Sequence, residues 1–435
     1  MSRVWSAIGL GRPELRAWAL YDWANSVFMT SVLQIFPIYF ARVAAHGLTA
    51  AQATARFGAA TALAMAVIAV ASPLLGVVAD HAGAKRTFLG GFVLLGVAAT
   101  SGMALVGPGD WRLGAALLAL ANIGFAGSAA FYDSLLPHVA RPDEIDRVST
   151  AGFALGYLSG GLVLAVNLAW IEWPGRFGFA DSNAATRASF LAAAVWWLVF
   201  SVPLFRHVAE PPRSGVGAPP GLAQLLTLEL GRVGSTLREV RRFRQAFLML
   251  FAFLVYNDGI NTVTRMGTSY GTEIGIGQGA LLGAVLLIQF LAVPFSFLFG
   301  SVAARIGARP TILLGLAVYV VIAGVGYFMR NALHFFVLAA LVGAVMGGTQ
   351  ALSRSLFATL IPKARSAEFF GFFGVFDKFA GIVGPALFAA AAGRLGTSRP
   401  AILALVVFFV AGGLVLSRVD IAAGQRAARE AELEP

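Results

Sequence analysis

Polar side chains recur at one spacing inside two long apolar stretches of this chain. An aspartate is followed three residues later by an asparagine at Asp22 and Asn25, and again 236 residues further on at Asp258 and Asn261. A carboxylate inside a bilayer costs about 3 kcal/mol or more, so such a residue faces a polar cavity or a partner. The repetition therefore predicts a duplicated membrane protein with a solute path between its halves.

The candidate path contains both carboxylates and cations. The ionisable residues inside or at the ends of the apolar stretches are Asp22, Asp133, Asp258, Arg265, Arg354, Asp377 and Lys378. They are either ion pairs that fix helix packing or members of a proton or solute relay, and the sequence leaves both roles open. For a relay, we expect Asp258 to carry the coupling ion, with Asp22 as the second choice.

One face of the seventh apolar stretch is polar. Asp258, Asn261 and Arg265 are spaced so that they share a helix face. The aspartate and the arginine lie about 10 Å apart along the axis, which is too far for a direct pair. A charged substrate between them is one explanation, and an amino-acid zwitterion, a sugar acid or a phosphorylated polyol would suit it.

The remaining polar residues of the apolar stretches are expected to contact other parts of the protein. Gln350 and Arg354 belong to a polar cluster in the tenth stretch, where an arginine must face protein, a cavity or the cytoplasm. Asp377 and Lys378 point about 100° apart on a helix, so we expect them to have different partners. Asp133 lies near the inner end of its stretch, and we expect it to form a gate ion pair.

Composition places the protein in a membrane. Of its 435 residues 58% are hydrophobic and only 12% are charged, and the mean hydropathy is +0.79. Soluble domains carry about 25% charged residues. The chain has no cysteine, its histidines lack metal-ligand spacing, and no catalytic or phosphate-binding motif is present. We therefore expect no enzyme, no metal and no cofactor.

Twelve apolar runs are long enough to cross a bilayer, which needs about 20 helical residues. The predicted spans are 17–40, 57–79, 87–106, 112–135, 150–171, 187–205, 245–270, 279–303, 310–329, 334–357, 369–392 and 400–417. The first span is expected to act as its own insertion signal.

The basic residues predict the orientation of these spans. With a cytoplasmic N-terminus, 21 of the 32 lysines and arginines lie on the cytoplasmic side and eight on the opposite side. This distribution places both termini in the cytoplasm. It also explains the net charge of +11 as topology, so we expect no nucleic-acid partner.

A short basic loop after the second span is partly repeated in the second half. Its notable residues are Gly76, Asp80, Gly83, Lys85 and Arg86. The glycines permit a tight turn, the cations hold it at the cytoplasmic surface, and the acid can accept from a helix N-terminus or a cation. The matching loop begins 224 residues later and has Ala304 in place of the acid. A proline motif that ends at Arg141 also recurs, so we assign these residues to a gating region.

These motifs resemble the major facilitator superfamily, and several segments are similar to its vacuole effluxer (autophagy-related) branch. The segments are Tyr21–Ser26, Phe131–Pro137, Asp143–Ser149, Tyr256–Thr262 and Gly347–Ser355. The resemblance covers about residues 16–417. It implies an all-α membrane fold of two pseudo-symmetric six-helix bundles, and export of a small solute such as an amino acid.

The resulting domain prediction has four parts. They are an N-terminal bundle (1–205), a cytoplasmic linker with a basic amphipathic helix (206–244), a C-terminal bundle (245–417) and a cytoplasmic tail (418–435). The arginines of the linker are equally explained as an ordinary positive flank.

The leading function is a secondary active transporter of a small polar solute that works by alternating access. We expect proton coupling, with sodium as the alternative ion, and export from the cytoplasm of a bacterium by a monomer in its inner membrane. The alternative is a lipid or lysolipid translocase, which would need a lateral opening to the bilayer.

Overall fold

The computed structural model describes residues 5, 6, 8–213, 242–395 and 397–433. Its long helices confirm the twelve predicted spans, each of them apolar enough to cross a membrane. The first span runs from Pro13 to Ala44 as α2 (Pro13–Val27) and α3 (Leu33–Tyr39), each followed by a π-helical turn. All regular elements of the described chain are helical.

The remaining helices continue in chain order. They are α4 (Ala50–Ala82), α5 (Lys85–Gly102), α6 (Trp111–Val139), α7 (Ile145–Glu172), α8 (Ser182–His207), α10 (Arg244–Glu273), α11 (Gln278–Ile306), α12 (Ala308–Tyr327), α13 (Ala332–Thr359), α14 (Ser366–Phe379), α15 (Val383–Leu395), α16 (Arg399–Ser417) and α17 (Ile421–Leu433).

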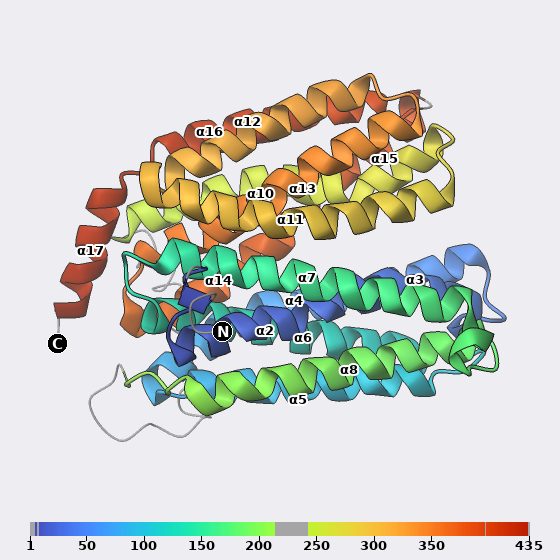
Figure 1. The fold of residues 1–435 in the computed structure, drawn as a ribbon, viewed down its shortest axis with the longest axis horizontal. Helices are drawn as coiled ribbons and strands as arrows, with labels where there is room; N and C mark the ends of the chain where they lie inside the picture. Colours follow the sequence, from blue (N-terminus) through green and yellow to red (C-terminus); the bar gives the residue numbers. More distant parts are fainter. Residues whose placement is uncertain (1–4, 7, 214–241, 396, 434–435) are drawn as a thin grey trace.

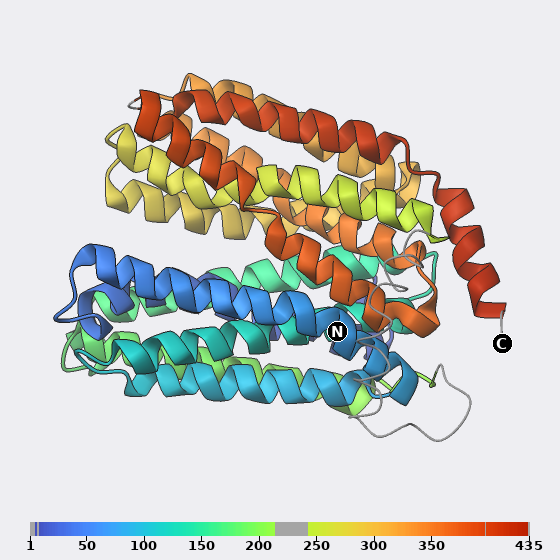
Figure 2. The same cartoon turned by 180° about the vertical axis from the view of Figure 1, so that it is seen from behind.

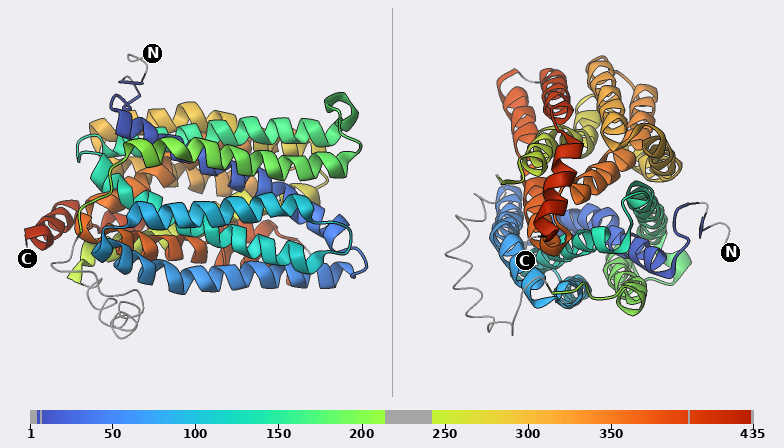
Figure 3. Two further views of the ribbon diagram at one scale, coloured as in Figure 1. Left: turned by 90° about the horizontal axis from the view of Figure 1, so that it is seen from below. Right: turned by 90° about the vertical axis from the view of Figure 1, so that its left-hand side faces the viewer.

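The helices form two groups that lie side by side (Figure 1). The first group contains α2 to α8, and the second contains α10 to α13 with α15 and α16 (Figure 2). Both termini and α17 lie at the same end of the molecule, which we call the inner end (Figure 3). The opposite end is called the outer end.

The eleventh span, predicted over 369–392, is not one continuous helix. It is divided into α14 and α15 by a break at 380–382. The inner piece, α14, packs mainly on α4 and α6 of the first group, whereas α15 packs on α10 and α16 of the second. The break therefore lets one span belong to both groups.

Most of the predicted linker (206–244), in which a basic amphipathic helix is expected, falls on 214–241, outside the described residues. The described chain instead contains α17, a short helix after the last span that the sequence reading treated as tail. Its Gly424 packs against Leu360 and Gln245, so this helix lies under the second group.

Glycines bring several helices into backbone contact. A Cβ at Gly124 of α6 would collide with the backbone of Gly96 and lie 2.8 Å from the carbonyl oxygen of Phe92 in α5. A Cβ at Gly76 of α4 would likewise collide with the backbone of Ala367 in α14. The first contact lies within one group, and the second joins the two groups at the inner end. Small residues that allow such approaches are typical of membrane helix packing.

We predict that Gly124→Val lowers the thermal unfolding temperature of the detergent-purified protein. Overpacking of a close contact costs about 1–3 kcal/mol. Gly91→Val is the matched control, because Gly91 lies on the exposed face of α5 with nothing near its Cβ position. Equal unfolding temperatures for the two variants would contradict the assignment of a packed α5–α6 seam.

Candidate functional site

A single arginine of the second group lies in a pocket of the first. The guanidinium of Arg354 in α13 contacts Asp22 of α2 through Nη2 at 3.1 Å and Asp133 of α6 through Nη1 at 3.0 Å. It also donates to the side chain and carbonyl of Ser149 in α7, at 3.0 Å each. The residue is only 3% exposed, so the pocket satisfies this buried cation almost completely.

Aromatic rings close this pocket. The Arg354 guanidinium carbon lies 4.8 Å from the ring centre of Trp18, 5.5 Å from that of Tyr132 and 4.5 Å from that of Phe153. Tyr132 also donates its hydroxyl to Asp22 at 2.8 Å. The rings exclude water and add cation–π attraction. The pocket contains two carboxylates and one guanidinium, so it is short of one positive charge.

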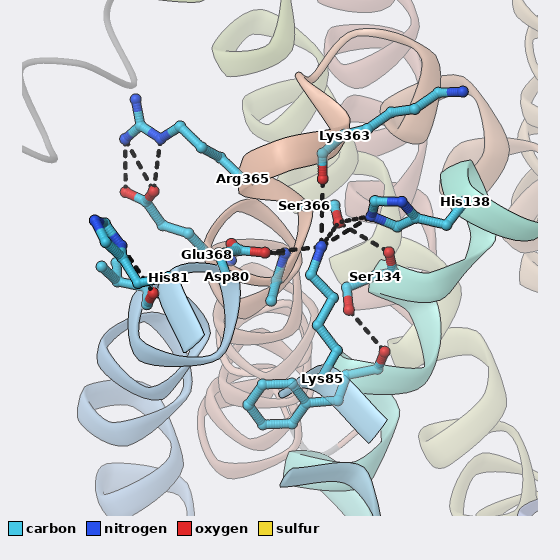
Figure 4. A network of polar contacts seen from close by, with 12 residues as sticks. Asp80, His81, Lys85, Ser134, His138, Lys363, Arg365, Ser366 and Glu368 are labelled. Atoms are coloured by element: carbon cyan, nitrogen blue, oxygen red, sulfur yellow. Dashed lines mark hydrogen bonds and ion pairs between the residues drawn. The ribbon is translucent and has the colours of Figure 1, made fainter. Parts of the chain in front are cut away.

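The loop after α4 forms a second link between the groups (Figure 4). Asp80 accepts from the backbone N–H of Glu368 at 2.9 Å and of Ala367 at 3.2 Å, so it caps the start of α14. Lys85 contacts Asp80 at 2.8 Å and donates to Ser366 at 2.7 Å. A carboxylate at a helix N-terminus is stabilised by the free N–H groups and the helix dipole.

Other members of the predicted gating region fix the conformation of the loop between α4 and α5. Gly83 has φ of +61°, which ends α4 in the left-handed conformation that glycine tolerates. Glu210 accepts from the backbone N–H of Arg86 at 3.0 Å, and burial raises the pKa of this carboxyl. The Arg86 side chain donates to the carbonyl of Phe205 in α8.

Two residues of the gating assignment, Asp133 and Arg141, lie apart from the α14 link, and Asp133 pairs with Arg354 instead. Arg141 contacts Glu144 at 3.2 Å on its own exposed segment, so the structure does not bring it to α14. Ala304, which matches Asp80 in the repeated motif, is exposed in the last turn of α11, and among the described residues it has no side-chain acceptor to form an equivalent of the Asp80 cap.

A polar cluster lies deeper in the molecule. Lys378 and Asp377 of α14 pair at 2.8 Å, which corrects the expectation that they have different partners. Asn257 of α10 donates to Asp377 at 3.0 Å, Gln350 of α13 approaches Asn257 at 3.5 Å, and Tyr157 of α7 approaches Gln350 at 3.3 Å. We call these five residues the central cluster. Asp377 lies about 16 Å along its span from the inner end, close to mid-membrane.

The second Asp-x-x-Asn motif is used differently from the first. Asp258 accepts three backbone N–H groups at the break of the eleventh span, and Asn261 donates to the carbonyl of Ala380 there at 2.8 Å. Arg265 is exposed, with no acid within ion-pair distance among the described residues. In the first motif, Asp22 contacts Arg354, and Asn25 is buried at 5% exposure.

The sequence reading missed three residues of these networks. Ser149 ends the segment Asp143–Ser149, and Tyr157 is one of several polar residues along α7, so neither pattern pointed to a contact with the second group. Asn257 is adjacent to Asp258, and adjacent residues on a helix point about 100° apart. This spacing could have predicted that Asn257 and Asp258 belong to different sites.

Comparison with known proteins identifies the family. The family model described as "Vacuole effluxer Atg22 like" matches residues 49–429. The chain belongs to this family. The MFS-type transporter YxiO of Bacillus subtilis (strain 168) is 37% identical over 406 residues, which cover 93% of this chain and 94% of that relative. Autophagy-related protein 22 of Coccidioides immitis (strain RS) is 24% identical over 425 residues, covering 81% and 70%.

Solved structures share the fold. The major facilitator transporter FucP, in the outward conformation, aligns with a TM-score of 0.70 at 12% identity, covering 94% of this chain and 100% of FucP. The proton:xylose symporter XylE aligns with a TM-score of 0.68 at 14% identity, covering 98% of each chain. The relatives and structural neighbours are transporters rather than enzymes. The Atg22-like chain is thus an integral, twelve-span major facilitator transporter.

We predict that Arg354→Ala opens the inner end. The change leaves two buried carboxylates without their cation, and loss of one partner of a buried pair costs about 3–5 kcal/mol. Ser355 is fully buried beside this contact, so a Ser355→Cys reporter should react with a thiol reagent on the order of 100-fold faster in the variant. Arg330→Ala, at an exposed arginine, is the control. Unchanged reactivity in Arg354→Ala would refute the gate assignment.

Proposed function

We propose that this transporter is a proton-coupled exporter of a zwitterionic small solute, of the amino-acid class, that works by alternating access. The observation that carries the proposal is the position of Arg354 between Asp22 and Asp133. The cation comes from one helix group and both acids come from the other. The contact exists only while the inner end is closed, so its rupture accompanies the opening of that end.

The unequal charges support proton coupling. Two carboxylates share one guanidinium in a pocket closed by aromatic rings, so the pocket has one negative charge in excess. A proton on Asp133 or Asp22 removes that excess and weakens the hold on Arg354. This assignment moves the coupling role from Asp258, whose carboxylate is occupied by backbone N–H groups, to the acids of the gate.

The central cluster supports a zwitterionic substrate. Asp377 and Lys378 are both part-buried, with side-chain exposures of 32% and 21%. A solute with an ammonium and a carboxylate can exchange partners with this pair and leave no charge unmatched. Tyr157 of the first group and Gln350 and Asn257 of the second supply further hydrogen bonds from both sides. The fungal relatives in the vacuole effluxer family favour export over import.

The basic excess supports the orientation. The inner end carries the loops with most of the lysines and arginines, so we assign it to the cytoplasm of a bacterium. The closed inner end then corresponds to an outward-facing state.

Lipid translocation remains the second candidate, and one observation favours it. An apolar groove between α7 and α8, lined by Trp170, Leu191, Val195 and Trp196, faces outward and would accept an acyl chain. The groove has no cation for a phosphate headgroup among its lining residues. The described structure therefore gives more support to a polar solute.

The substrate class is tested by thermal stabilisation of the purified protein. Binding to the native state raises the unfolding temperature. We expect stabilisation by at least one of the twenty L-amino acids, and none by its analogues that lack the amino or the carboxyl group. Asp377→Asn should abolish the effect, and Asp143→Asn at an exposed site should not. Stabilisation by lysophosphatidylcholine alone would favour the lipid alternative.

The coupling is tested in proteoliposomes with that amino acid. An imposed pH gradient should drive transport of the wild-type protein. Asp133→Asn should lose this dependence and keep exchange of labelled for unlabelled solute, because exchange needs no net proton movement. If Asp133→Asn and Asp22→Asn both retain wild-type responses to the gradient, the gate acids do not carry the proton.

A further inference from the structure

The break in the eleventh span is built and held by specific contacts. The inner helix ends at Phe379 and the outer helix begins at Val383, with Gly381 between them at φ of +117°. An L side chain rarely adopts this backbone conformation, so glycine is required for it. The break is thus a defined conformation rather than a frayed helix end (Figure 2).

Asp258 of the neighbouring α10 binds the free N–H groups at this break. Its Oδ1 accepts from Gly381 at 3.0 Å and from Gly384 at 3.1 Å, and its Oδ2 accepts from Val383 at 3.2 Å. The side chain is 4% exposed. Both carboxylate oxygens therefore act as acceptors of backbone N–H groups. The carboxylate serves as an N-cap supplied by another helix.

The rest of this face of α10 completes the clamp. Asn261 donates to the carbonyl of Ala380 at 2.8 Å, so it satisfies the chain on the other side of the break. Thr262 contacts the position that a Cβ of Gly384 would occupy, which keeps α15 close to α10. Three neighbouring residues of one helix thus bind both ends of the interruption.

The charged groups around Asp258 come from few elements. Arg265 starts two turns further along α10, and its guanidinium lies beside Gly381 at the break. Asp377 and Lys378 precede the break on α14. On α15, the only ionisable side chain is Arg394 at its far end, and Phe409 is the contact that α16 makes beside Asp258, against Gly259. Lys378 pairs with Asp377, and the hydrogen bonds of the Asp258 carboxylate come from backbone N–H groups and, at 3.4 Å, from the Thr262 hydroxyl.

We propose that Asp258 is a positioning residue, which clamps the break in the eleventh span and thereby orients the Asp377–Lys378 pair toward Asn257, the next member of the central cluster. Ala380, which the clamp binds, lies two residues after Lys378. The clamp also holds α15 against the second group while α14 remains against the first. The orientation of the pair rests on the proposed function of the central cluster, whereas the clamp itself can be tested without any substrate.

The native chain lacks cysteine, so introduced cysteines report on single sites. One pair of spin labels at Ala51 and Arg394 spans the outer end, and a second pair at Arg206 and Arg418 spans the inner end. All four sites are exposed. Distance distributions from electron–electron double resonance are compared for the wild type, Asp258→Ala and Gly381→Ala. The control is Asp181→Ala, which removes the exposed N-cap of α8 at a distant site.

We expect Asp258→Ala and Gly381→Ala to broaden the outer distribution, with the inner distribution and the Asp181→Ala control unchanged. Loss of a charge-assisted hydrogen bond shifts a conformational equilibrium by about tenfold or more. A cysteine reporter at Phe379→Cys occupies an exposed site beside Lys378. We expect its reactivity with a thiol reagent to change about tenfold in both variants. A loss of overall stability alone would leave this reactivity unchanged. Gly381→Ala keeps the carboxylate, so it tests the clamp even if Asp258→Ala does not fold.

The same spectra at pH 5 and pH 8 separate positioning from proton coupling. We expect the pH response of the wild type to persist in Asp258→Asn and to disappear in Asp133→Asn. The proposal is overturned if Asp258→Ala gives wild-type distances and reactivity, or if Asp258→Asn alone removes the pH response. A wild-type protein without any pH response would refute proton coupling in the proposed function, and the clamp would still be decided by the distances.

Discussion

A buried guanidinium must have its charge matched inside the protein, and this requirement ties the two helix groups together at the inner end. Arg354 satisfies the requirement only by entering the other group, where Asp22, Asp133 and Ser149 receive it. When the groups separate, both acids and the cation need water or new partners. The same contacts therefore decide the electrostatics of the pocket and the conformation of the molecule.

Helix α14 connects this inner end to the centre of the membrane. Its first residues are capped by Asp80, its last turn carries Asp377 and Lys378, and the clamped break follows directly. A rigid helix of 14 residues can transmit a displacement from one of these sites to the others. The Asp80 cap, the Asp377–Lys378 pair and the break thus all lie along one membrane span.

Sequence patterns predicted much of the fold, because bilayer-length apolar runs and flanking cations are local signals. The partners of Arg354 in its pocket could not be predicted from such local patterns. Arg354 lies 332 residues from Asp22 and 221 from Asp133, and helix periodicity gives the face of a residue but not the helix that it meets. For a related reason, the sequence marks Gly381 equally as a close-packing or a hinge position and does not predict the break itself. Gly381 in an apolar run is compatible with a continuous helix, and only Asp258 of another span stabilises the interruption.

The loss of the acid at Ala304 makes the two inner seams chemically unequal. The α4–α14 seam is fastened by the Asp80 cap and Lys85, whereas the α7–α11 seam relies on the close contact of Gly300 with Thr150. Helices that touch through small groups can slide past each other at a low cost in free energy. A charge-assisted cap loses its hydrogen bonds as soon as the helices separate. When the inner end opens, we therefore expect the α4–α14 contact to separate abruptly, whereas the α7–α11 contact persists and the helices rotate about it.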